Sequence, residues 1–145
     1  MQDILTCAMG LDVHRDIIVA CLVKGAVDAE PEAETRTFST LIPEMQKLRD
    51  WVIESECRNI AMESTGIYWQ PIYEMLESCF DGEISILVVN ARHMKNVPGR
   101  KTDMKDAQWI ATLLRAGLLK GSFIPDKAFR ELRHLTRYRK SVVHD

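Results

Sequence analysis

The stretch CAMGLDVHRDIIVACLV (residues 7–23) decides how the chain begins to fold. Two apolar, β-prone runs, residues 7–14 and 16–23, flank a short polar segment, and this pattern predicts a β-hairpin. Asp12 interrupts the first run between apolar neighbours. Carboxylates are seldom buried unless they are paired or bind a metal ion. The stretch therefore predicts the first two strands of a sheet and marks Asp12 as a candidate functional acid.

The segments that follow alternate between strand-like and helix-like patterns of apolar residues. We expect strands at residues 35–40, 58–63 and 83–90, and helices at residues 43–56 and 66–80. We then expect a basic loop or short helix at residues 91–101. It is followed by a helix at residues 103–115, which Gly117 ends, and by a basic amphipathic helix at residues 126–145. The order β-β-β-α-β-α-β-α predicts a mixed α/β sheet flanked by helices and is typical of the ribonuclease-H-like fold.

Length and composition indicate one globular domain. The chain has 145 residues, of which 46% are hydrophobic and 28% charged, enough to form a core without cross-links. No apolar run approaches the ~20 residues that span a bilayer, and the N-terminus lacks a signal-peptide pattern. We therefore expect a cytoplasmic protein. Its four cysteines have no C-x-x-C spacing and are expected to be reduced residues of the core.

The formal net charge of −2 is unevenly distributed along the chain. Residues 1–90 contain 6 Lys+Arg and 16 Asp+Glu, whereas residues 91–145 contain 13 and 5, giving −10 and +8. Clustered basic residues supply the sequence-independent part of nucleic-acid affinity. The basic C-terminal third therefore suits a protein that contacts phosphates, although a solvated basic surface would look the same.

Four acids are candidates for one site. In a ribonuclease-H-like sheet the strands that carry Asp12 and Glu63 are neighbours, so both carboxylates are expected at one edge. Asp103 and Asp106 are three positions apart at the start of a helix, where such a pair shares one face. They also suit a plain helix cap. Four converging acids repel one another, and Mg²⁺ or Mn²⁺ relieves that repulsion and supports phosphodiester chemistry. The predicted catalytic and metal-binding residues are Asp12, Glu63, Asp103 and Asp106.

Several motifs make a family resemblance specific. The segments GLDVHRD, MESTGIYWQPIYEML, VVNARHMKNVPGRKTDMKDAQWIATLLRAGLL and GSFIPDKAFRELRHLTRYRK resemble, in this order, the N-terminal part of the DEDD transposases. These insertion-sequence recombinases contain a RuvC-like domain and are related to pilin-gene DNA invertases. The resemblance implies DNA strand exchange with Mg²⁺ (or Mn²⁺), and it assigns the family's four acids to the positions named above.

The resemblance also implies partners and a domain organisation. Many family members are guided by a structured (bridge) RNA, and we expect DNA, such an RNA and a homo-oligomer in the full-length protein. Family proteins continue into a helical linker and a second domain with a serine. We therefore expect residues 1–125 to be the RuvC-like domain and residues 126–145 to begin the linker of a partial protein, which alone would not complete recombination.

Further residues are candidates for contacts with nucleic acid. Basic side chains near the acids and in the last helix would bind phosphates, with solvated surface charge as the alternative. They are His14, Arg15, Arg92, His93, Lys95, Arg100, Lys101, Lys105, Arg133 and Arg137. Tyr68, Trp69 and Tyr73 suit either base stacking or the core. Ser64 and Thr65 are expected to cap the following helix.

Three other functions compete with the recombinase hypothesis. In a non-catalytic nucleic-acid-binding or assembly module the acids would be structural. A DEDD-type exonuclease usually has D-x-E in its first strand, whereas this chain has Asp12-Val13-His14. An actin-like or sugar-kinase-like ATPase needs small residues in its first phosphate loop, where this chain has His14 and Arg15. The first alternative stays open.

Overall fold

The structure is a computed structural model that describes residues 4–64, 66–90, 94, 97–101, 104–119 and 121. The helix expected at residues 126–145 lies outside this part of the chain. None of the described helices has the length and apolar character that a bilayer crossing requires.

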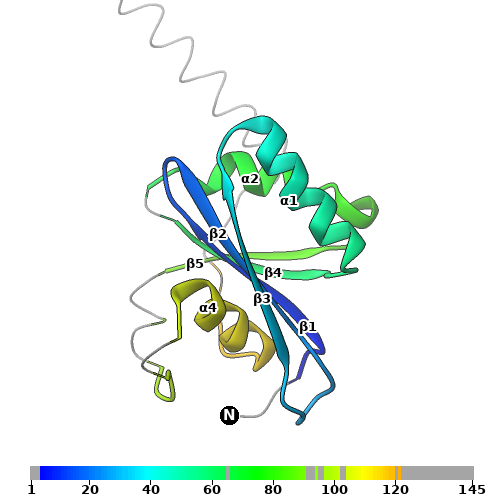
Figure 1. The fold of residues 1–145 in the computed structure, drawn as a ribbon, viewed down its shortest axis with the longest axis vertical. Helices are drawn as coiled ribbons and strands as arrows, with labels where there is room; N and C mark the ends of the chain where they lie inside the picture. Colours follow the sequence, from blue (N-terminus) through cyan, green and yellow to red (C-terminus); the bar gives the residue numbers. More distant parts are fainter. Residues whose placement is uncertain are drawn as a thin grey trace, which may run out of the picture.

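Five strands form one mixed sheet in the order β3-β2-β1-β4-β5 (Figure 1). β1 pairs antiparallel with β2 and parallel with β4; β2 and β3 are antiparallel, and β4 and β5 are parallel. The predicted hairpin and the neighbouring positions of the first and fourth strands are confirmed. The strands are β1 (Cys7–Val13), β2 (Ile17–Lys24), β3 (Glu32–Ser39), β4 (Asn59–Ser64) and β5 (Ser85–Val89).

Two helices, α1 (Ile42–Glu54) and α2 (Trp69–Leu76), cover one face of this sheet, and α4 (Asp106–Arg115) covers the other (Figure 1). Side chains alternate between the two faces along a strand. Met9, Leu11 and Val13 of β1 therefore pack in the cluster with α1 and α2, whereas Ala8 packs with α4. This layered arrangement confirms the predicted α/β architecture with helices on both faces.

Helix α4 approaches β1 closely because Gly10 has no side chain. A Cβ placed on Gly10 would overlap the carbonyl oxygen of Ala107 and lie 2.7 Å from the amide nitrogen of Ala111. Ala107 and Ala111 are themselves small, and both are buried. Small residues on both elements thus bring the helix backbone directly onto the first strand.

The C-terminal end of α4 is fixed to the start of β1. The buried Arg115 guanidinium donates to the carbonyls of Leu5 (2.9 Å), Gly25 (3.0 Å) and Ala26 (2.7 Å). Gly117 ends the helix with φ +72°, as predicted. Its amide and that of the next residue bond to carbonyls of the last helical turn, the Schellman pattern of helix ends.

Some predicted boundaries differ from the structure. β3 begins at Glu32, three residues before the predicted start at residue 35, because it pairs with β2 along its full length. α2 begins at Trp69, later than predicted, and its N-cap is Tyr68. Ser64 is the last residue of β4, so the prediction that it caps this helix is wrong. Thr65 lies outside the described residues.

Candidate active site

Two of the predicted acids are direct neighbours in the sheet. Asp12 of β1 and Glu63 of β4 are Cα partners in parallel strands, which lie about 4.8 Å apart. Ala8 and Ala61 pack in the α4 cluster and lie an even number of positions from Asp12 and Glu63 on the same strands. Both acids therefore occupy the face covered by α4. The two carboxylates therefore leave the same face, side by side, near the C-terminal ends of their strands.

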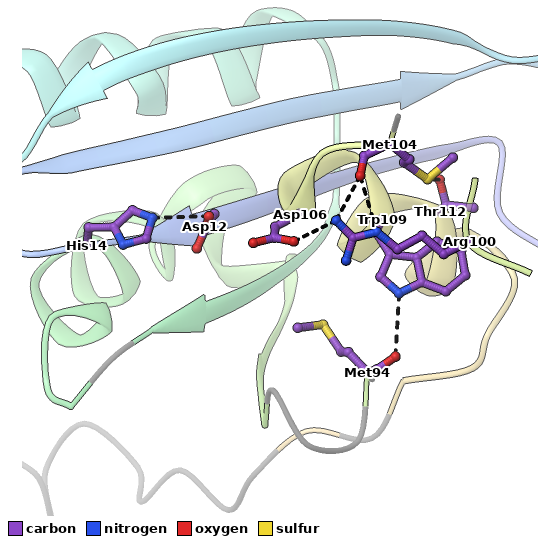
Figure 2. A network of polar contacts seen from close by, with 8 residues as sticks. All are labelled: Asp12, His14, Met94, Arg100, Met104, Asp106, Trp109 and Thr112. Carbon is purple, nitrogen blue, oxygen red and sulfur yellow. Dashed lines mark hydrogen bonds and ion pairs between the residues drawn. The ribbon is translucent and has the colours of Figure 1, made fainter. Parts of the chain in front are cut away.

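Helix α4 carries a third acid to the same edge of the sheet. Its C-terminal residue, Arg115, contacts Leu5 just before β1, and its middle packs over Gly10, so the helix runs antiparallel to β1. The N-terminal residue, Asp106, is consequently at the end of β1 that carries Asp12. Figure 2 shows the Asp106 carboxylate between Asp12 and Arg100 in this view.

Each of the two aspartates has a basic partner. His14 Nε2 lies 3.1 Å from Asp12 Oδ2, and the Asp12 side chain is only 17% exposed. Arg100 donates to Asp106 Oδ1 over 2.7 Å and to the carbonyl of Met104 over 2.8 Å (Figure 2). Arg100 thereby fastens the segment preceding α4 to the first residue of the helix. Asp106 is bound to this guanidinium.

The start of α4 differs from the prediction. The helix begins at Asp106 with Lys105 as N-cap and no side-chain cap, so Asp106 is its first residue and not its third. A carboxylate at this position interacts favourably with the helix dipole. Asp103 lies outside the described residues. The expected i, i+3 pair of Asp103 with Asp106 therefore stays a prediction.

The donor set is chemically suited to a hard divalent cation. Asp12 and Glu63 offer adjacent carboxylates from rigid strands, and Asp106 adds a third from a helix N-terminus at the same edge. Carboxylate oxygens are the ligands that Mg²⁺ and Mn²⁺ prefer. Within the described residues, however, no three His, Cys, Asp or Glu side chains are already gathered closely enough to hold a metal ion.

The described basic candidates lie around this edge. Arg15 follows β1, is exposed and is 3.4 Å from Asp16, and Lys101 and Lys105 are exposed near the start of α4. Arg15 also lines an open hollow of about 400 Å³ together with Tyr68. The other basic candidates, Arg92, His93, Lys95, Arg133 and Arg137, lie outside the described residues.

The aromatic candidates divide between core and surface. Trp69 and Tyr73 pack against the main core and contact each other edge to face, with ring centroids 5.5 Å apart. They therefore belong to the core. Tyr68 is exposed and remains available for stacking on a base.

Sequence reasoning missed the specific partners of two arginines. In the sequence, Arg100 was one basic residue among several. It precedes Asp106 by six positions and lies before the helix, so helical spacing could not predict their ion pair. Arg115 was predicted only as the last residue of a helix, yet its side chain is buried and bonds three carbonyls. The available signal was a basic residue in the last helical turn, two positions before the capping glycine.

Comparison with solved structures supports the fold. RuvC of Thermus thermophilus superimposes with a TM-score of 0.53 at 14% identity, covering 80% of this chain and 99% of that chain. The T. thermophilus RuvC solved in complex with a Holliday junction substrate gives 0.52 at 13% identity, with the same coverage. At such low identity the likeness establishes the RuvC, ribonuclease-H-like fold alone.

The sequence comparison identifies the family. None of the curated proteins matches the chain. Residues 9–145, which are nearly the whole chain, match the family of IS110-type DEDD transposases, described as "Transposase". The chain therefore belongs to the DEDD transposase family.

Proposed function

We propose that the chain supplies the metal-dependent acid site of a recombinase that cleaves and exchanges DNA strands in transposition or site-specific recombination, with Asp12, Glu63, Asp103 and Asp106 as its acids. Membership of a transposase family and the RuvC-like fold support action on DNA. The observation that carries the proposal is the pairing of Asp12 with Glu63 on the face of the sheet where α4 presents Asp106.

The chain's own residues have distinct roles in this proposal. Asp12 and Glu63 would hold Mg²⁺ or Mn²⁺ from the sheet, and Asp106 would join them on leaving Arg100. The bound ion supplies positive charge for the phosphate and lowers the pKa of an attacking water or hydroxyl. Arg100, released from Asp106, together with Lys101 and the other exposed basic side chains would bind the DNA backbone.

The proposal includes two kinds of nucleic-acid partner. The RuvC structure solved with a Holliday junction is similar in fold, which supports branched DNA as a substrate here. A structured guide RNA and a homo-oligomer are proposed from the family resemblance. The basic C-terminal third of the sequence, with a formal charge of +8, supplies the phosphate affinity that both nucleic acids require.

Calorimetric titration of Mn²⁺ and Mg²⁺ tests the proposed site. Wild-type protein is compared with Asp12→Asn, Glu63→Gln and Asp106→Asn, which preserve shape but remove charge. Asp50→Asn is the matched control, because Asp50 is an exposed acid on α1, across the sheet from α4. We expect saturable heat in the wild type and control and at least ~10-fold weaker binding in the three variants, since each removes a charged ligand.

Thermal melting without metal separates a ligand from a structural acid. Asp12→Asn and Glu63→Gln are expected to melt at or above the wild-type temperature, because removing one of two adjacent acids relieves repulsion. Asp106→Asn is expected to melt slightly lower, because it loses the Arg100 ion pair and the favourable helix-dipole interaction. Equal metal binding by wild type and variants, together with lower melting points for Asp12→Asn and Glu63→Gln, would show that the acids are structural and refute the metal site.

A non-catalytic nucleic-acid-binding module is the second candidate. It is favoured by the Arg100–Asp106 ion pair, which gives this acid a partner without metal. In that case Asp12→Asn would bind branched DNA and structured RNA as well as the wild type does. Neither protein would cleave labelled branched DNA in the presence of Mn²⁺.

A further inference from the structure

Two thiols lie at the end of the β1–β4 pair that is opposite the acids. Cys7 is the first residue of β1 and is half-buried, and Cys57, two residues before β4, is fully buried. Met9 pairs with Ile60, so Cys7 is level with the residue that follows Cys57. Both cysteines pack in the cluster under α1. The fold therefore brings together two thiols that are 50 positions apart in the sequence.

The surroundings of the two thiols favour a thiolate on Cys7. The Cys57 hydrogen bond and the positive charge of Lys24 lower the pKa of Cys7 to about 7, although burial opposes them. Lys24 is the Cα partner of Cys7 on β2. The hydrogen bond to Cys7 and burial raise the pKa of Cys57, so this thiol stays protonated. The Cys57 Sγ also lies 3.3 Å from the carbonyl oxygen of Asn59.

We propose that Cys7 and Cys57 are an oxidation site that closes into an intramolecular disulfide when the protein meets a hydroperoxide. The Cys7 thiolate attacks one oxygen of hydrogen peroxide, the O–O bond breaks, and a sulfenic acid and one water are formed once a proton is taken up. The sulfur of Cys57 then attacks the sulfenic sulfur, its proton leaves with the hydroxyl as a second water, and the S–S bond forms. Two thiols are oxidised and one peroxide is reduced.

This division of roles follows from the burial of the two sulfurs. A half-buried thiolate is accessible to a small peroxide, whereas the buried Cys57 resolves the intermediate from the adjacent position. The two remaining cysteines cannot replace it. Cys21 faces the α4 side of the sheet with Ala107 and Ala111, and Cys79 lies beyond α2 in the short 3₁₀ turn before β5.

Peptide mapping under non-reducing conditions tests the proposal on the full chain. After brief treatment with hydrogen peroxide and blocking of free thiols, we expect a linked pair of peptides containing Cys7 and Cys57. Cys21→Ser and Cys79→Ser are the matched controls and should still give the link. In Cys57→Ser, Cys7 should instead be labelled by a sulfenic-acid-specific dione.

Melting provides a second readout. The link closes a loop of about 50 residues, which restricts the unfolded chain, so oxidised protein should melt at least ~5 °C higher and return to the starting value with dithiothreitol. Cys7→Ser should show no such rise. The proposal is overturned if Cys7 reaches sulfinic acid with Cys57 unlinked, if the disulfide joins two copies of the chain, or if neither cysteine reacts.

Discussion

Replacing Gly10 by alanine tests whether the close approach of α4 to β1 determines the stability of this face. The new Cβ would overlap the Ala107 carbonyl oxygen and lie 2.7 Å from the Ala111 nitrogen and 3.0 Å from the Ile110 Cβ. Ordinary contacts of this kind are about 3.5–4.0 Å long. Since the obstructing atoms are mostly helix backbone, rotation of a side chain cannot relieve the overlap. The helix has to lift by roughly 1 Å, the deficit between these distances and ordinary contacts.

The expected cost follows from two opposing terms. Overpacking of a filled core costs about 1–3 kcal/mol, and a backbone obstruction belongs at the upper end of that range. Alanine also restricts the unfolded chain, which returns about 0.4–1 kcal/mol. The free energy of unfolding should therefore fall by about 2–3 kcal/mol. For a domain of this size that corresponds to a melting point lower by roughly 6–10 °C.

The measurement is urea and thermal unfolding of Gly10→Ala beside Gly25→Ala. Gly25 precedes the β2–β3 connection, where a new Cβ would lie 3.2 Å from the Cα of Pro31. A connecting loop adjusts more easily than a helix packed on a sheet, so the control should lose less than about 1 kcal/mol. Equal melting points for the two variants would show that α4 has room to move, and the argument from close packing would be wrong.

Three further changes have defined outcomes. Arg115→Met should lower the free energy of unfolding by about 3 kcal/mol in urea, because three carbonyls lose their buried, charged donor. Arg115→Lys should not restore the stability, because an ammonium group lacks the planar fork of donors that a guanidinium has. Gly117→Ala should lower the free energy of unfolding by about 1–2 kcal/mol in the same assay, because φ is +72° at this position. A decrease below about 0.5 kcal/mol, which is typical of surface substitutions, would contradict this. Arg100→Ala should strengthen Mn²⁺ binding several-fold in calorimetry by releasing Asp106, whereas Lys101→Ala, which removes an exposed charge nearby, should not.

The sheet was predictable because its signals are local. Runs of apolar residues identified each strand, and the single charge within the first run identified Asp12. The neighbouring positions of Asp12 and Glu63 followed from the ribonuclease-H-like sheet that the order of elements indicated. β3 was predicted too short because its first residues, Glu32 to Glu34, are acidic and polar, and only pairing with β2 makes them a strand.

The surroundings of the acids depend on contacts that sequence spacing does not encode. Capping rules favoured Asp103 as the start of a helix, yet the helix begins at Asp106. Arg100, which precedes the helix, bonds both the Met104 carbonyl and the Asp106 carboxylate. The Cys7–Cys57 contact joins residues whose separation carries no pattern. Such contacts depend on how the elements are arranged in space, which local sequence patterns do not specify.

The tight packing of α4 also determines which motions are available to Asp106. The acid is one residue from Ala107, whose carbonyl lies over Gly10, and a helix rises only about 1.5 Å per residue. Tilting of the helix about so near a contact displaces the Asp106 backbone by well under ~1 Å. For Asp106 to leave Arg100 and bind another partner, only exposed side chains have to rotate, which takes picoseconds to nanoseconds. If this edge binds nucleic acid as proposed, its slow steps should come from nucleic-acid binding, because the Asp106 carboxylate changes partners much faster.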